Sequence, residues 1–260
     1  MNALIKELLF SPRSTCLGCG SVLGTDRDWL CADCYAGLNP LYVNGMAQKR
    51  ICLNCGEEYV SGFCRVCKKR KVATLEAVSS YEFEGAIRNL VHAFKFSGVW
   101  RLNGWMAEEM LKACQSDFLE GVTDVVPTPM HKMRRLVRGY NQSEKLAIAF
   151  CKLTGIPINE SLKRIRNTKQ QVKLKGEARR KNLTGAFECR QDLSGRTVLL
   201  IDDVRTTGST AVNCAKTLLA SGASEVRVLT FAQAVNHAPD NKKYAPDRGV
   251  KLIKPIKDEF

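Results

Sequence analysis

Between residues 73 and 235 the chain alternates short apolar runs with longer stretches in which apolar side chains recur at helical spacing. The short runs are rich in branched and aromatic residues and predict strands over residues 75–83, 122–126, 198–201 and 226–232. The amphipathic stretches predict helices over residues 85–96, 100–113, 143–153 and 211–219. Strands that alternate with helices in this way indicate an α/β domain.

The two ends of the chain show a different pattern. Residues 1–72 hold too few apolar residues at either period to build a core, and residues 35–51 could be partly helical or loop. Residues 236–260 contain three prolines among mixed charges, which predicts a loosely packed tail. We therefore expect three parts, with boundaries at 1–72, 73–235 and 236–260.

Length and composition agree with a folded protein that has a hydrophobic core. The chain has 260 residues, of which 45% are hydrophobic, and this excludes a wholly disordered chain. No apolar run approaches the length of a membrane span, so no membrane insertion is expected. Residues 1–10 carry Lys6 and Glu7 and make a poor signal peptide, so a cytoplasmic location is expected.

The positive charge of the chain is concentrated in one stretch. The net charge is +14, and residues 130–181 hold fifteen Lys and Arg against three acidic residues. Such a field attracts polyanions, and both pyrophosphate and nucleic acid qualify. The alternative is a solvated basic surface that serves solubility.

Eight of the twelve cysteines form four Cys-x-x-Cys pairs, at residues 16/19, 31/34, 52/55 and 64/67. Thiolate pairs at this spacing are typical of tetrahedral structural zinc, and folding of residues 1–72 should then depend on the metal. Pairing in sequence order predicts two sites, although a crossed pairing and a redox or disulfide use stay open. The predicted ligands are Cys16, Cys19, Cys31, Cys34, Cys52, Cys55, Cys64 and Cys67.

The richest candidate chemistry follows the predicted strand at residues 198–201. Asp202 and Asp203 come at its end, and a turn of Thr, Gly and Ser at residues 206–210 leads into a helix. Backbone N–H groups and hydroxyls at a helix start bind phosphate, while adjacent carboxylates accept hydrogen bonds from a sugar diol. Together they predict a site for a ribose 5-phosphate. The alternative is an ordinary strand-to-helix turn with a Thr or Ser cap.

Two basic segments could complete this site. Residues 130–142, after the Pro-Thr-Pro at 127–129, are predicted to form an Arg-rich loop at the carboxyl end of a strand. Arg suits pyrophosphate because its guanidinium is planar and always charged. Residues 162–187 are polar, basic and poorly periodic, and we interpret them as a mobile flap that includes Arg164 and Arg166.

The sequence Leu-Ile-Asp-Asp-Val-Arg-Thr-Thr-Gly-Ser-Thr at residues 200–210 resembles the phosphoribosyl pyrophosphate (PRPP) signature of type I phosphoribosyltransferases. With the cysteine pairs, the basic loop and the flap, in this order, the chain resembles the ComF/GntX family. The resemblance implies a type I phosphoribosyltransferase fold, a mainly parallel sheet flanked by helices, preceded by a double zinc ribbon. It covers residues 16–232.

The resemblance also implies roles for individual residues. Asp202 and Asp203 would hold the ribose hydroxyls at the catalytic centre. The 5-phosphate would be bound by Arg205, Thr206, Thr207, Gly208, Ser209 and Thr210. Pyrophosphate would be bound by Arg134, Arg138, Gly139 and Asn141, under a flap with Arg166, Gln171, Arg179 and Asn182.

The cofactors that the resemblance implies are two structural zinc ions, and magnesium that binds together with PRPP. The implied function is binding of PRPP by a protein that acts in uptake of single-stranded DNA during natural transformation, with a ComFA-type helicase as partner. Two alternatives stay open. One is an active phosphoribosyltransferase of unknown acceptor in nucleotide metabolism, and the other is a non-catalytic DNA-binding adaptor.

Overall fold

The computed structural model describes residues 15–23, 29–60, 63–64, 66–70, 73–114, 117–166 and 185–234. They group into two compact units. One unit holds the described part of Met1–Leu38 together with Glu84–Val99, and the other holds Asn39–Phe83 and Trp100–Ala234. The predicted tail at 236–260 lies outside the described residues, and the boundary at residue 72 stays a prediction. Within the described ranges, no helix is long and apolar enough to cross a membrane.

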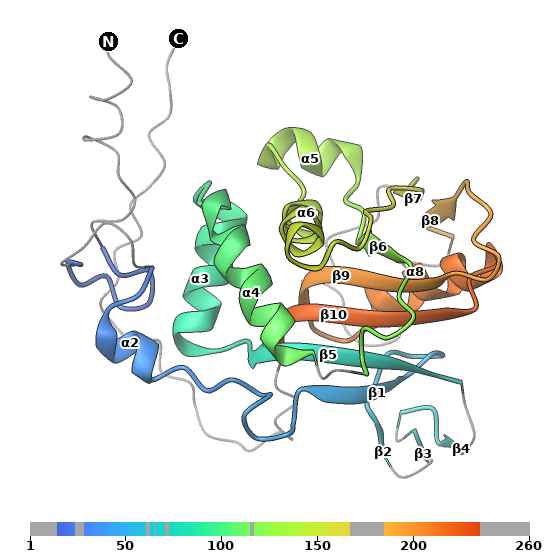
Figure 1. The fold of residues 1–260 in the computed structure, drawn as a ribbon, viewed down its shortest axis with the longest axis horizontal. Coiled ribbons are helices and arrows are strands. Elements are labelled where there is room, and N and C mark those ends of the chain that lie inside the picture. The colour runs from blue at the N-terminus through green and yellow to red at the C-terminus, as the bar shows by residue number, and fades with distance from the viewer. Residues whose placement is uncertain are drawn as a thin grey trace. The chain divides into compact units, whose positions relative to one another are not determined.

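The larger unit is built on a five-stranded sheet with the order β1-β5-β10-β9-β6. Four neighbouring strands are parallel, and β1 pairs with β5 antiparallel at one edge (Figure 1). The strands are β1 (Gln48–Cys52), β5 (Thr74–Glu82), β6 (Asp124–Pro127), β9 (Thr197–Arg205) and β10 (Glu225–Gln233). A mainly parallel sheet confirms the fold class expected from the sequence, and places the ends of β6 and β9 side by side.

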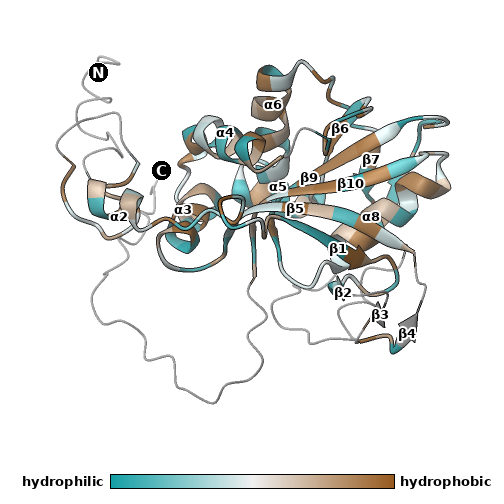
Figure 2. Cartoon of the chain, turned by 60° about the horizontal axis from the view of Figure 1, so that its bottom comes forward, coloured by the Kyte–Doolittle hydropathy of each residue, from teal (hydrophilic) through white to brown (hydrophobic). Residues whose placement is uncertain are grey.

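Helices cover both faces of this sheet. After the short helix η1 (Trp100–Leu102), α4 (Asn103–Ala113) packs with α6 (Gln142–Thr154) on one face. Helix α8 (Ser209–Ala220) packs on the other face, as Figure 2 shows. Leu200 of β9 and Val228 of β10 share a buried apolar cluster with Leu218 of α8. The buried apolar sheet with helices on both sides explains why β9 begins with four consecutive buried apolar residues.

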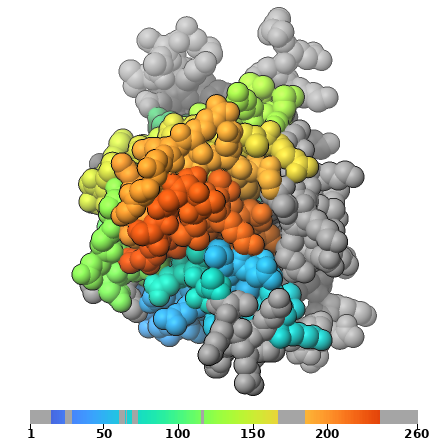
Figure 3. Space-filling view, turned by 90° about the vertical axis from the view of Figure 1, so that its right-hand side faces the viewer, coloured from blue at the N-terminus to red at the C-terminus, as the bar shows by residue number. Residues whose placement is uncertain are grey.

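Smaller elements surround the sheet. Strands β2 (Tyr59–Val60), β3 (Phe63–Cys64) and β4 (Lys69–Arg70) form an antiparallel sheet, and β7 (Leu162–Arg164) pairs with β8 (Phe187–Cys189). Figure 3 shows the segment that follows β1, in blue and cyan, lying against the orange C-terminal part of the same unit. Segments about 150 residues apart in the sequence are therefore neighbours.

The smaller unit joins α2 (Ala32–Ala36) and α3 (Gly85–Phe96) to the first four cysteines. The amide of Asn89 in α3 donates a hydrogen bond of 2.8 Å to the carbonyl oxygen of Gly18. Gly18 lies so close to α3 that a methyl group there would come 3.1 Å from Cβ of Ala86. The first cysteine segment therefore packs directly on α3.

Three local predictions are wrong. The segment 35–51, predicted as helix or loop, ends in strand β1, because Ile51 and Cys52 are buried while the polar residues before them occupy a sheet edge. The basic segment 130–142 contains the helix α5 (Lys132–Arg138), whose N-terminus is capped by His131, since its side chain accepts a hydrogen bond from the Met133 amide. Strand β9 does not end before Asp202, because β10 continues to pair with it as far as Arg205.

Candidate functional site

The two carboxylates lie near the carboxyl end of β9, beside the start of α6. The hydroxyl of Ser143 donates a 2.7 Å hydrogen bond to Oδ1 of Asp202, and the backbone N–H of Asp203 donates to the same oxygen at 2.9 Å. Asp203 is buried, with 7% of its surface exposed. These two hydrogen bonds hold the side chain of Asp202, one residue beyond the point where β6 ends beside β9.

The turn after β9 has the features of a phosphate site. Helix α8 begins at Ser209, and Gly208 precedes it in the left-handed region with a φ of 66°. The hydroxyls of Thr207 and Ser209 lie 3.0 Å apart. The first backbone N–H groups of a helix have no partner within the helix, so they and the two hydroxyls can bind an anion together. We call residues Thr206–Thr210 the phosphate loop.

Arg134 is near enough to Arg138, and Arg164 to Arg134 and Asp202, for their charges to interact. Burial and the charge of Arg138 both lower the pKa of Arg134. Burial and the charge of Arg134 likewise lower the pKa of Arg164, while the charge of Asp202 opposes this. Guanidinium groups that repel one another in this way are stabilised by an anion placed between them. The geometry therefore brings together a basic group from α5 and β7 with an acidic group from β9.

The loop between α5 and α6 fixes the position of the basic residues. Asn141 is buried, and its amide donates a 3.1 Å hydrogen bond to the carbonyl oxygen of Thr128, at the end of β6. Arg138 donates to Gln142 at 3.0 Å. Gly139 ends α5 with a φ of 85°. These contacts attach the segment predicted to bind pyrophosphate to the end of β6.

Of the remaining predicted site residues, the structure describes Arg166 and Arg205. Gln171, Arg179 and Asn182 of the predicted flap are outside the described residues, and Arg166 is exposed. Arg205, predicted to contact the 5-phosphate, is buried with 7% of its surface exposed. Its guanidinium donates to the side-chain oxygen of Gln233 and lies 3.9 Å from a carboxylate oxygen of Glu58. Burial lowers the pKa of Arg205, which Glu58 and Glu57 oppose.

Sequence reasoning did not include Ser143 among the candidate site residues, and it named Arg164 in the flap without giving it a role. Ser143 contacts Asp202, and Arg164 is close enough to both Asp202 and Arg134 to affect its pKa. Arg164 lies in the three-residue strand Leu162–Arg164, where Leu162 is buried, Lys163 is exposed and Arg164 is half-buried. This alternation of buried and exposed side chains was the only pattern that could have indicated it. Such a short strand cannot be distinguished from the surrounding basic segment by periodicity alone.

The eight paired cysteines form two separate groups of four. In each group, the four Sγ atoms lie within 4.8 Å of one another. One group contains Cys16, Cys19, Cys31 and Cys34, and the other Cys52, Cys55, Cys64 and Cys67. The pairing in sequence order is therefore confirmed, and each group could hold a zinc ion.

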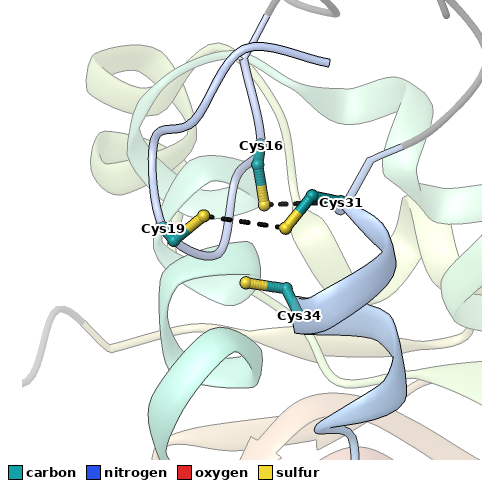
Figure 4. Close-up of side chains that lie close together, drawn as sticks. All are labelled: Cys16, Cys19, Cys31 and Cys34. Carbon is teal, nitrogen blue, oxygen red and sulfur yellow. Dashed lines mark hydrogen bonds between the residues drawn. The ribbon is translucent and has the colours of Figure 1, made fainter. Parts of the chain in front are cut away.

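Distances within both groups fit tetrahedral zinc. A Zn–S bond of about 2.3 Å implies sulfur atoms about 3.8 Å apart. Sγ of Cys19 lies 3.7 Å from that of Cys31, as drawn in Figure 4, and Cys52 lies 3.9 Å from Cys67. Backbone N–H groups of Gly18 and Cys31 point at Sγ of Cys16, at 3.3 and 3.2 Å, which suits a thiolate. Four thiolates would fill every position of each metal, so a zinc ion bound there would have a structural role.

Comparison with known proteins finds no matching family model. Among curated proteins, competence protein F of Haemophilus influenzae is 28% identical over 84% of this chain and 96% of its own length. The DNA utilization protein YhgH of Salmonella typhimurium is 29% identical over 77% of this chain and 93% of its own. Competence protein ComFC of Bacillus subtilis is 27% identical over 80% of this chain and 89% of its own.

Among solved structures, a purine phosphoribosyltransferase from Pyrococcus horikoshii is 13% identical, covers 54% of this chain and 85% of its own, and has a TM-score of 0.32. A TM-score this low does not establish the fold, and the fold class is assigned from the strand order and the mainly parallel pairing of the sheet. Similarity to the competence and DNA utilization proteins extends across most of the chain, and with the sheet and the two cysteine groups it confirms the resemblance to the ComF family.

Proposed function

We propose that this chain binds PRPP at the carboxyl edge of its sheet. The observation that supports this most directly is the arrangement of three different chemistries around the end of β9. The phosphate loop suits the 5-phosphate, the carboxylates of Asp202 and Asp203 suit the ribose hydroxyls, and the guanidinium groups of Arg134 and Arg164 suit pyrophosphate.

Charge explains why the ligand would be a diphosphate rather than a neutral sugar. Burial and neighbouring positive charge lower the pKa values of Arg134 and Arg164, and a multiply charged anion would stabilise both guanidinium groups. Magnesium would accompany the ligand, because a hard cation bridges pyrophosphate and sugar oxygens. In a transfer reaction the same arginines would stabilise the departing pyrophosphate.

Calorimetric titration with PRPP and magnesium tests this proposal. We expect one PRPP per chain with a dissociation constant in the micromolar range, typical of enzyme substrates. Ribose 5-phosphate, which lacks pyrophosphate, should bind on the order of 100-fold more weakly, because it makes no charge-assisted hydrogen bonds to the arginines. Absence of PRPP binding by a chain that retains its zinc would reject the proposal.

A second observation favours handling of single-stranded DNA, and the name of one relative, DNA utilization protein YhgH, refers to DNA. The ring of Trp100 is 46% exposed, with the guanidinium of Arg101 at 5.7 Å from its centroid and Nζ of Lys145 at 5.5 Å. An exposed aromatic ring between two cations can stack a base while the cations contact phosphates. We therefore propose Trp100 as a base-stacking residue. The basic residues Lys132 and Arg135, both exposed on α5, would add to the attraction.

Binding of a thymidine oligonucleotide, measured by fluorescence anisotropy at several salt concentrations, tests the second function. Trp100→Ala should weaken binding about ten-fold at fixed salt, since stacking contributes about 1–3 kcal/mol per base. The control is Phe96→Ala, which removes another exposed aromatic ring. Affinity that falls equally in both variants, or in neither, would contradict a stacking role for Trp100.

A further inference from the structure

The turn that follows Cys55, in the first pair of the second cysteine group, touches the phosphate loop. Gly56, next to Cys55, has a φ of 83°, and a Cβ atom built on it would lie 2.5 Å from the carbonyl oxygen of Thr207 and 2.7 Å from the carbonyl carbon of Gly208. No side chain fits between segments this close, so backbone lies directly on backbone.

The turn is part of the second cysteine group rather than a loop beside it. The backbone N–H of Gly56 donates to the carbonyl oxygen of Cys52 at 2.8 Å, and that of Cys52 donates to Glu57 at 2.8 Å. Sγ of Cys55 lies 3.4 Å from Sγ of Cys64. A metal bound by these thiolates would fix the backbone from Cys52 to Cys55. Gly56 would be fixed with it, because its N–H donates to the carbonyl oxygen of Cys52.

A second contact joins the same two segments. Glu58 lies two residues after Gly56, and its carboxylate is 3.9 Å from the guanidinium of Arg205. Arg205 is the last residue of β9 and immediately precedes the phosphate loop. Its Nε is buried and has no hydrogen-bond partner among the described residues. The guanidinium group instead interacts with the carboxylate of Glu58 and donates a hydrogen bond to Gln233. The turn therefore supports the loop at both its backbone and its anchoring strand.

We propose that the second cysteine group positions the phosphate loop, with Gly56 and Glu58 as positioning residues. Metal at Cys52, Cys55, Cys64 and Cys67 would set the loop for binding of a sugar phosphate. This inference rests on the proposed function only in naming the ligand of the loop. It gives the two cysteine groups different roles, because the first belongs to the other compact unit.

The chain offers a matched control for Gly56. Gly20 follows Cys19 in the first cysteine group as Gly56 follows Cys55, and its φ is 82°. A Cβ atom built on Gly20 would meet nothing within 4 Å. Alanine at either position imposes the same backbone conformation on a side chain, but only at position 56 does the methyl group displace the phosphate loop.

Hydrogen–deuterium exchange of residues 206–212 and PRPP calorimetry, on Gly56→Ala and Gly20→Ala, test the proposal. We expect both variants to bind zinc like the wild type. Only Gly56→Ala should exchange these amides about ten-fold faster and bind PRPP on the order of ten-fold more weakly. Glu58→Gln, which leaves the turn unaltered, should shift exchange in the same direction by a smaller factor.

Equal loop exchange in the two alanine variants, with Glu58→Gln unchanged from wild type, would overturn the positioning role. Because exchange needs no ligand, its outcome is separate from that of the proposed function. Faster exchange in Gly56→Ala alone, in a protein whose wild type does not bind PRPP, would support the positioning role and reject the ligand.

Discussion

The double variant Asp202→Asn/Asp203→Asn is expected to bind PRPP on the order of 100-fold more weakly than the wild type and to keep its fold. Each carboxylate would lose a charged hydrogen bond to a ribose hydroxyl, which is worth about 1.5–3 kcal/mol. Asparagine retains an oxygen that can still accept from Ser143, so the contact that now holds Asp202 at 2.7 Å survives. Calorimetry with PRPP and magnesium gives the affinity.

The matched control is Glu108→Gln/Glu160→Gln, which removes two exposed carboxylates and changes the net charge by the same amount. Its PRPP affinity should equal that of the wild type. An equal loss in both double variants would mean that the overall charge, rather than the two acids of β9, governs binding. Unchanged affinity in the Asp variant would remove both residues from the ligand site.

Replacing Cys64 with serine is expected to lower the zinc content from two ions per chain to one and to destabilise the larger unit. Cys64 is fully buried and belongs to β3, and its group joins β1 to the small sheet. Structural zinc contributes about 10–16 kcal/mol of binding free energy in isolated fingers, much of which is folding free energy. Elemental analysis gives the zinc content, and thermal unfolding gives the stability.

Cys151→Ser is the control, since Cys151 is a half-buried thiol of α6 outside both groups. It should retain two zinc ions per chain and unfold close to the wild-type temperature. Two zinc ions in Cys64→Ser would show that the second group does not bind metal through this thiol. One zinc ion with wild-type stability would mean that the metal contributes nothing to the fold.

Much of the larger unit could be predicted from periodicity, because its strands and helices are buried on the faces that the pattern indicates. Residues 198–201 are all fully buried, and the predicted helix at 143–153 agrees with α6. Strand β1 could not be predicted, since an edge strand with charged residues lacks a clear period. Helix α5 was missed because Leu136 and Val137, 78% and 89% exposed, give it no buried face.

In the candidate site, too, sequence motifs could be predicted, whereas contacts between distant segments could not. Motifs placed the carboxylates, the phosphate loop and the basic segment in order along the chain, and the sheet brings their strands together. Contacts between distant segments carry no local signal. Arg205 meets Glu58, and Trp100 meets Lys145, only because of the tertiary fold.

The strand order has a consequence for synthesis of the chain on the ribosome. Strand β10 occupies the middle of the sheet between β5 and β9, yet it is the last of the five to be translated. Strand β5 ends at Glu82 and β10 begins at Glu225, so at about 5–20 residues per second β5 waits roughly 10–30 s for this partner. During that interval β5 lacks its parallel neighbour, while both sets of cysteine ligands have already been synthesised and could bind metal. Metal loading would therefore precede closure of the sheet, and early association with a chaperone would protect β5 in the meantime.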